Sequence, residues 1–319
     1  MTRLLIALAF FCTPVLFGRS LAPYVQERRF IDRLVVAAQR TPPSGIAIKA
    51  LEDIALGTSI DLRPAAERLG ILSFSRQEYF AVPEVRAYAI LHLADIHDSN
   101  VAAFLSSLST ESLGPDGTEE LYDALAIAQR HSKLDEMTSE AEQVDFLEGV
   151  LQDRSNSPGL IGAKLWAIDQ LCDDHASVSS VPIIGVTLRR LDSRRGEHYL
   201  YLCKAKIQAL QSENRVAALG ALLIAPAASP ELDPQGAVSM WALNKLMTMH
   251  TDAAERELTD FMAKTETPDP KAKWNDHISL LRELMRGREA QIAALRKPDE
   301  DEMESERRAM EKELLRQKN

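Results

Sequence analysis

Aromatic residues are scarce in this 319-residue chain, because phenylalanine, tryptophan and tyrosine together make up only 6% of it. Runs of β-branched residues are also short and few, which disfavours strands. Alanine and leucine dominate the apolar positions instead, and both residues favour helix. The hydrophobic fraction of 45% excludes a chain that is disordered throughout. The composition therefore predicts an all-α fold.

Positive charge is also in deficit, and the formal net charge is −10. A chain this acidic repels phosphate backbones, so we expect no nucleic-acid partner. A protein partner is expected to be basic and to bind in a salt-sensitive way. One short stretch is locally basic and is interpreted as a solvated helix end and loop: Arg189, Arg190, Arg194 and Arg195.

The apolar segment at the N-terminus is shorter than a transmembrane helix. Residues 4–17 form an uncharged run of 14 residues, whereas spanning a bilayer takes about 20. A short positive start precedes this run, and small residues follow it up to Ala22. Because this order is typical of a signal peptide, we expect residues 1–22 to be removed and the protein to be periplasmic or secreted, away from the membrane. The alternative is a protein anchored in the membrane by the uncleaved segment.

Motifs for catalysis are missing. The chain has no Gly-x-Ser-x-Gly elbow and no glycine-rich phosphate loop after a strand. The carboxylate pairs Glu52-Asp53 and Glu119-Glu120 fit helix surfaces and first turns, which supply neither burial nor a shifted pKa. We therefore expect no catalytic, cofactor-binding or metal-ligating residue, and no enzyme. The alternative is an all-α enzyme with a site that no motif marks.

What the chain does contain is a repeat. Four helical segments can be superposed on their final leucines, and the intervals between these leucines are 78, 39 and 36 residues. The first interval leaves room for one more unit between Leu121 and Leu151. A period in the high thirties predicts two-helix repeats, stacked so that each covers the apolar face of its neighbour. We expect this stack to span residues 23–270, with the aligned leucines Leu93, Leu171, Leu210 and Leu246.

Residues 83–93 read Pro-Glu-Val-Arg-Ala-Tyr-Ala-Ile-Leu-His-Leu. This segment resembles the second-helix signature of HEAT repeats, and Arg215-Val216-Ala217 echoes it. The resemblance covers about residues 83–265. It implies an α-α superhelix of stacked hairpins that acts as an interaction scaffold, with no shared catalytic residues. Armadillo and tetratricopeptide arrays are the alternatives.

The histidines are the natural candidates for metal or acid–base chemistry. His92 and His97 are five residues apart, which places them on different faces of one helix. His97, His175 and His250 each follow an aligned leucine by four residues, so we expect each to end its helix and to bond free carbonyls there. Separated by two repeats, they are too distant to share a zinc ion. The alternative is a single Asp–His site at Asp173-Asp174-His175.

The same alignment bears on Cys172 and Cys203. It places them eight residues apart along neighbouring helices, about 12 Å of axial offset, which is too far for a disulfide. Two separate buried thiols are therefore expected. Trp166 and Trp241 occupy nearly equivalent positions and are interpreted as packing residues, with an aromatic ligand groove as the alternative.

Residues 271–319 differ from the repeats because they are highly charged and poor in apolar residues. We interpret them as a terminal helix that caps the stack, followed by a charged helix. A short coiled coil over residues 274–296, joining the chain to itself or to a partner, is the alternative. The heptad-spaced residues are Ile278, Leu281, Met285, Arg288, Ile292 and Leu295.

Together these features predict a non-catalytic protein-binding scaffold of the cell envelope or exterior. A membrane-tethered structural protein, which oligomerises through its C-terminal helix, is the alternative.

Overall fold

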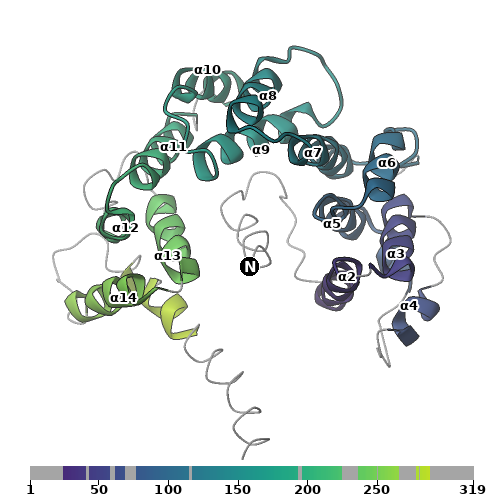
Figure 1. The fold of residues 1–319 in the computed structure, drawn as a ribbon, viewed down its shortest axis with the longest axis horizontal. Coiled ribbons are helices and arrows are strands. Elements are labelled where there is room, and N and C mark those ends of the chain that lie inside the picture. Colours follow the sequence, from purple (N-terminus) through teal and green to yellow (C-terminus); the bar gives the residue numbers. More distant parts are fainter. Residues whose placement is uncertain are drawn as a thin grey trace, which may run out of the picture. The chain divides into compact units, whose positions relative to one another are not determined.

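The computed structural model describes residues 24–40, 43–57, 62–68, 77–114, 117–192, 196–224, 236–249, 251–265, 278–279 and 281–287. Within these ranges all regular structure is helical and no strand occurs, which confirms the predicted all-α fold (Figure 1). The signal peptide expected over residues 1–22 and the charged tail from residue 288 onward lie outside the described residues.

The chain divides into two compact units, Met1–Gln211 and Ser212–Asn319, called unit 1 and unit 2. Unit 1 contains the helices α2 (Val25–Ala38), α3 (Gly45–Leu56), α4 (Arg63–Arg68), η3 (Gln77–Ala81), α5 (Pro83–Ala94), α6 (Ser99–Ser107), α7 (Glu119–Asp135), α8 (Glu140–Gln152), α9 (Leu160–Asp173), α10 (Val181–Leu191) and α11 (Gly196–Leu210). Unit 2 contains α12 (Arg215–Leu222), α13 (Ala237–Met249) and α14 (Asp252–Lys264).

Local sequence signals fix where these helices begin. The side chains of Ser44, Asp98, Ser139 and Thr251 each accept a bond from a backbone N–H in the first turn of the following helix. Such caps satisfy N–H groups that have no partner inside the helix. These four residues therefore mark helix starts that can be recognised from the sequence alone.

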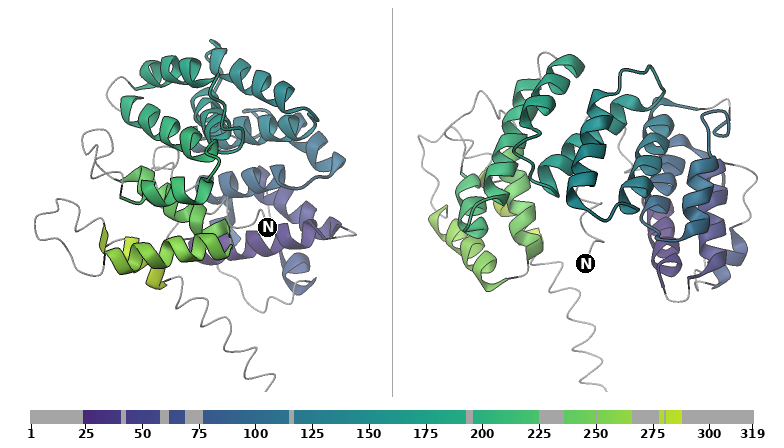
Figure 2. Two further views of the ribbon diagram at one scale, coloured as in Figure 1. Left: turned by 60° about the vertical axis from the view of Figure 1, so that its left-hand side comes forward. Right: turned by 45° about the horizontal axis from the view of Figure 1, so that its top comes forward.

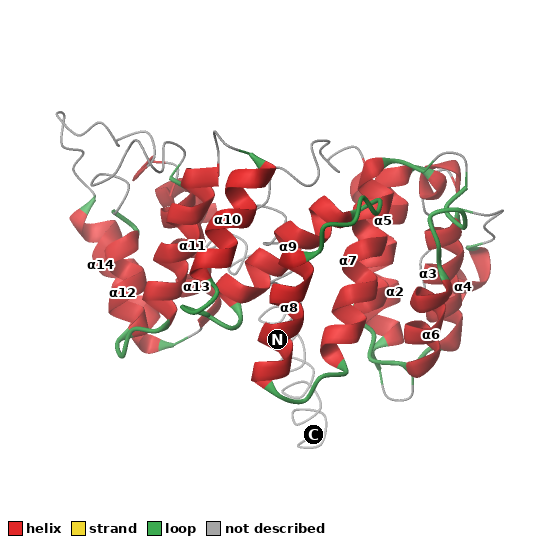
Figure 3. Cartoon of the chain, turned by 90° about the horizontal axis from the view of Figure 1, so that it is seen from above, coloured by secondary structure: helices red, strands yellow, loops and turns green. Residues whose placement is uncertain are grey.

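Unit 1 is built as two rows of helices. In the first row α2, α5, α7, α9 and α11 follow one another, and each packs on the next. The second row contains α3, α6, α8 and α10, and each of these packs on the following helix of the first row, for example α8 on α9 (Figures 1 and 3). The helices of one hairpin thus cover the apolar face of the next hairpin.

The spacing of the helices agrees with the predicted period. The helices α5, α7, α9, α11 and α13 begin at residues 83, 119, 160, 196 and 237, so successive starts differ by 36, 41, 36 and 41 residues. The additional repeat expected between Leu121 and Leu151 is the helical pair α7 and α8. All four aligned leucines lie in this series of helices, although Leu210 is only partly buried.

One buried cation ties several elements of unit 1 together. Arg86 of α5 is 4% exposed. Its guanidinium donates to the carbonyls of Ala55 at 3.2 Å, Leu56 at 3.0 Å and Leu113 at 2.9 Å. The first two carbonyls belong to the C-terminal end of α3, where no helical N–H remains to bond them. Arg86 therefore caps α3 and holds the turn after α6.

Helices α7 and α9 approach closely at Asp123 and Gly162. Asp123 is 6% exposed, and its Oδ1 accepts a bond from the backbone N–H of Gly162 at 3.2 Å. Burial, opposed by the Gly162 bond and assisted by Glu119 and Glu120, raises the pKa of Asp123 from its ordinary 3.8 to about 6. The folded protein thus holds a proton on Asp123 at a pH where the unfolded chain has lost it.

This proton makes stability depend on pH in a predictable direction. Because the folded state binds more protons between about pH 4 and 6, ionisation of Asp123 lowers stability as pH rises through that window. Asp123→Asn removes the ionisation, and is expected to be more stable than the parent at pH 7 by about 1–2 kcal/mol and by less at pH 4.5. Urea unfolding at both pH values measures this difference. A difference independent of pH would contradict the assignment to Asp123.

Unit 2 is a smaller helical cluster in which α12 packs on α13 and on α14, and α13 packs on α14 (Figure 2). Trp241 of α13 is buried, as its interpretation as a packing residue requires. The helical residues 281–287 also belong to this unit, and Arg282 donates to the carbonyl of Met262 at 2.6 Å. Two of the heptad-spaced residues, Leu281 and Met285, are buried. None of the described helices combines the length and the apolarity that a membrane crossing needs.

Candidate functional site

A network of histidines and aspartates lies where α5 and α7 end. Helix α5 ends at Ala94, and the connection to α6 carries Asp95 and His97. His131 and Asp135 lie on successive turns at the end of α7. Because α5 and α7 are neighbours in the first row, their C-terminal ends bring these side chains together.

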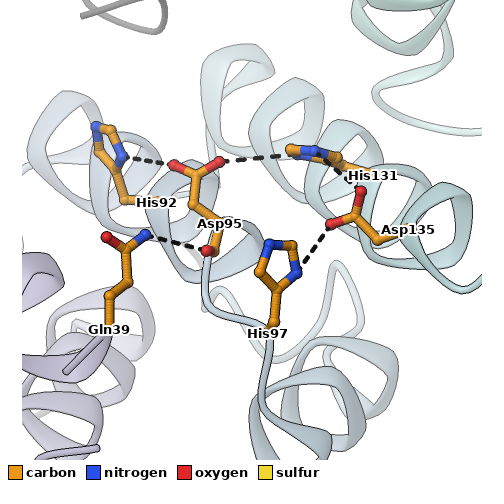
Figure 4. Close-up of polar contacts among 6 residues, drawn as sticks. All are labelled: Gln39, His92, Asp95, His97, His131 and Asp135. Atoms are coloured by element: carbon orange, nitrogen blue, oxygen red, sulfur yellow. Dashed lines mark hydrogen bonds and ion pairs between the residues drawn. The ribbon is translucent and has the colours of Figure 1, made fainter. Parts of the chain in front are cut away.

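Histidine and carboxylate side chains alternate through this network (Figure 4). His92 Nδ1 lies 2.9 Å from Asp95 Oδ2, and His131 Nδ1 lies 4.0 Å from Asp95 Oδ1. On its other side, His131 Nε2 lies 3.7 Å from Asp135 Oδ1, and His97 Nδ1 lies 3.5 Å from Asp135 Oδ2. Each carboxylate thus bridges two imidazoles, and only the contact between His92 and Asp95 is short enough for a strong hydrogen bond.

Asp95 is held in place from two sides. Its backbone N–H bonds the carbonyl of His92 at the end of α5. Its carbonyl accepts a bond from Gln39 Nε2 at 3.1 Å, which links the network to the end of α2 (Figure 4). The position of the carboxylate is therefore fixed by backbone contacts as well as by the histidines.

His92 is the most enclosed histidine of the network, at 8% exposure. Its ring lies edge-on to Tyr88, with ring centroids 4.3 Å apart. The Tyr88 hydroxyl donates to Asp32 at 2.7 Å, and burial together with this bond raises the pKa of Tyr88 above its ordinary value. Since a carboxylate only accepts hydrogen bonds, the contact with Asp95 places a proton on Nδ1 of His92. Within the described residues, its buried Nε2 has no hydrogen-bond partner.

The network becomes more exposed toward α6. The His97 side chain is 79% exposed and that of Asp135 is 31% exposed. His131 lies between these ends, with its ring centroid 6.1 Å from that of the partly buried Trp166 of α9. Among the described residues, no group of three or more histidines, cysteines or carboxylates could hold a metal ion.

Asp95 is expected to be the residue on which this network depends. Asp95→Ala leaves Nδ1 of the buried His92 without its acceptor, and we expect the free energy of unfolding to fall by about 1–3 kcal/mol. His97→Ala is the matched control, because its side chain is mostly exposed and its loss is expected to change stability by less than about 0.5 kcal/mol. Urea denaturation at pH 7 compares the two variants. Equal losses would contradict the central role of Asp95.

The sequence pattern predicted that His97 and His175 lie near helix ends. It did not predict that the side chains of the network come together. His97 and His175 both follow the end of a helix, but they lie beyond the last turn of α5 and α9 and do not cap it with their side chains. The side chain of His97 contacts Asp135 instead, and Nδ1 of His175 lies 3.9 Å from Glu140 Oε1. His250 lies outside the described residues. One signal marked the network, namely the four-residue spacing of His131 and Asp135.

The Asp–His alternative at residues 173–175 has a different partner. Asp173 is bonded by the ammonium of Lys206 at 3.2 Å, and Lys206 also contacts Asp169 at 3.5 Å. The predicted pair Glu52 and Asp53 contacts Lys49 on α3, but burial raises the pKa of Glu52, contrary to the expectation of an unshifted pair. Glu119 and Glu120 lie in the first turn of α7. Arg189 and Arg190 form the last turn of α10, as predicted, whereas Arg194 and Arg195 lie outside the described residues.

Both cysteines are buried free thiols, as expected, but they are not separate. Cys172 of α9 and Cys203 of α11 lie in one apolar cluster, and the neighbouring Cys203 thiol and burial raise the pKa of Cys172. The leucine alignment assumed that residues 39 positions apart lie level with each other. The observed bonds between the ends of α9 and α11 join residues separated by 33 to 37 positions. The two helices are therefore shifted relative to that alignment.

Comparison of this chain with protein-family models, with curated proteins and with solved structures finds no match.

Proposed function

We propose that this chain is a non-catalytic protein-binding scaffold of the cell envelope or exterior, built as a HEAT-like superhelix of stacked helical hairpins. The observation that carries the proposal is one packing contact that recurs along the chain. Helix α6 packs on α7, α8 on α9, α10 on α11, and α12 on α13. In each case the second helix of one hairpin covers the first helix of the next. Stacks of this kind present extended surfaces that bind other proteins.

Charge supports a basic partner. The formal net charge of the chain is −10. Helix α8 exposes Glu140, Glu142 and Asp145, and α14 exposes Asp252, Glu255 and Asp260. Acidic surfaces attract basic proteins from a distance and lose that attraction as salt screens it. The export that the first 22 residues indicate would place this encounter outside the cytoplasm.

The test is chemical cross-linking of the full chain in envelope extracts, with the captured protein identified by mass spectrometry. We expect capture of a basic protein at low salt and its loss near 0.5 M salt, where screening limits the attraction between charges to a few ångströms. Two variants locate the contact. Glu142→Gln with Asp145→Asn neutralises α8, and Glu255→Gln with Asp260→Asn makes the same charge change on α14. Capture that neither variant nor salt reduces would contradict an acidic binding surface.

A second candidate function is catalysis by an all-α enzyme, with His92 as its base. A carboxylate-held histidine with an unpartnered, buried Nε2 is the arrangement of a general base. His92→Gln separates the two functions, because a scaffold is expected to capture its partner equally well without this nitrogen. Loss of capture together with preserved folding would instead assign His92 to a ligand site.

The tethering alternative concerns residues 274–296. The burial of Leu281 and Met285 supports a terminal helix that packs within unit 2, and these are two of the residues that a coiled coil would use. Light scattering of the chain with and without residues 274–319 tests the alternative. Equal monomeric masses support the scaffold, whereas an oligomer that needs the tail supports tethering.

A further inference from the structure

The two thiols between α9 and α11 are adjacent for a structural reason. Cys172 and Cys203 lie on neighbouring helices of the first row and within one apolar cluster of unit 1. Their exposures are 0% and 5%, and both side chains are free thiols. Two free thiols that share one buried cluster on neighbouring helices are placed to form a covalent bond if their helices are in the right register.

Three polar contacts, made by two side chains, indicate the register of α9 and α11 independently of the sulfur atoms. The Lys206 side chain of α11 reaches Asp169 and Asp173 of α9, and the Gln211 side chain reaches the carbonyl of Ala176. Side chains on a helix point toward its N-terminus. Lys206 and Gln211 therefore contact residues that come earlier in the chain than the residues lying level with their own backbone atoms. This correction brings Cys203 level with Cys172.

We propose that Cys172 and Cys203 form a reversible disulfide when the folded protein meets a disulfide oxidant, such as glutathione disulfide or an oxidised thiol–disulfide exchange protein. This inference goes beyond the proposed scaffold function and does not depend on it. The bond would join two neighbouring helices of the row and close the chain segment that contains α10. Unit 1 would thereby gain a covalent link between two successive hairpins.

The reaction is a pair of thiol–disulfide exchanges. Cys203, the less buried thiol, loses its proton, and its sulfur attacks one sulfur of the oxidant. The oxidant's disulfide bond breaks, and one of its halves leaves as a thiol. The sulfur of Cys172 then attacks the mixed disulfide at Cys203, forms the bond between the two cysteines and releases the other half as a second thiol. The two cysteines are oxidised by two electrons, and the oxidant is reduced to two thiols.

Burial determines the kinetics of this reaction. A thiol that is buried in an apolar cluster is a poor nucleophile as long as it stays protonated and covered. Exchange therefore needs a local opening of the α9–α11 contact. The disulfide is expected to form slowly in the native protein and, once formed, to resist reduction until the same contact opens.

The experiment uses the full chain with Cys12→Ser, so that only this pair remains. The native protein is incubated with glutathione disulfide, quenched in acid, unfolded and treated with N-ethylmaleimide. We expect no maleimide uptake, a mass lower by two hydrogens, and a peptide that links Cys172 to Cys203. Dithiothreitol is expected to restore both thiols. Uptake of two maleimides, or persistent glutathione adducts without the linked peptide, would overturn the proposal.

A thermal measurement tests whether the native geometry suits the bond. The oxidised form is expected to unfold about 5 °C higher than the reduced form. An unchanged or lower midpoint would show that the bond strains the α9–α11 contact, and would overturn the proposal of a preformed pair. Cys203→Ser with Cys12→Ser is the matched control, because its remaining thiol cannot form the internal bond and the oxidant should leave its midpoint unchanged.

Discussion

Arg86→Ala is expected to lower the free energy of unfolding by about 3–5 kcal/mol. The substitution removes the guanidinium that bonds the carbonyls of Ala55, Leu56 and Leu113. Because Arg86 is 4% exposed, water cannot replace these bonds without opening the contact between α3 and α5. Urea denaturation followed by circular dichroism measures the loss.

Two controls separate bonding geometry from charge at this position. Arg86→Lys keeps the charge but lacks the planar fork that reaches several carbonyls at once, so it is expected to recover only part of the stability. Arg189→Ala removes an arginine of which the side chain is 52% exposed and that pairs with Glu197 at 3.3 Å. That variant is expected to change stability by less than about 1 kcal/mol. Equal effects of Arg86→Ala and Arg189→Ala would contradict the capping role of Arg86.

Gly162→Ala is expected to have the second large effect, a loss of about 2–4 kcal/mol. A Cβ atom at Gly162 would lie 2.5 Å from Cγ and 2.6 Å from Cβ of Asp123. These distances are shorter than any van der Waals contact between carbon atoms, so α7 and α9 would have to separate. Unfolding in urea measures the loss, and Gly149→Ala is the matched control. Gly149 lies in α8 with no atom within 4 Å of its added Cβ, so that variant is expected to gain about 0.5–1 kcal/mol.

A double-mutant cycle identifies the atom responsible. If the clash is mainly with the carboxyl group of Asp123, the added methyl group is expected to cost at least 1 kcal/mol less when Asp123 is already alanine. Because alanine keeps the Cβ atom of residue 123, additive effects of Asp123→Ala and Gly162→Ala would show that this Cβ atom or another contact limits the approach of α7 to α9.

The sequence predicted the helices better than it predicted how they fit together. Alternation of apolar runs with capping residues such as Ser139 and Thr251 is a local signal, and the helix starts follow it. The level at which α9 meets α11 depends instead on how their side chains interlock. No residue encodes this shift by itself, which is why Cys172 and Cys203 were expected to be separate.

The network around Asp95 shows the same limit. From sequence, His92 and His97 belonged to one continuous helix and faced different directions. Helix α5 ends at Ala94, so the connection that follows can turn His97 toward α7. Only the packing of α5 beside α7 brings His131 to Asp95. A sequence motif also does not predict burial by itself. Arg86 is buried, whereas Arg215, the corresponding arginine at the start of α12, is exposed.

The recurring contact between successive hairpins has an evolutionary consequence. Helix α8 packs on α9 much as α6 packs on α7. A duplicated α7–α8 hairpin could therefore make the same kind of helix contact with the hairpin before it and the hairpin after it. Gain or loss of whole hairpins, in steps of about 36–41 residues, therefore preserves the apolar faces. Insertion of a single helix would move every following helix into the other row and expose those apolar faces to water. Descendants of this gene are accordingly expected to differ in length by whole hairpins.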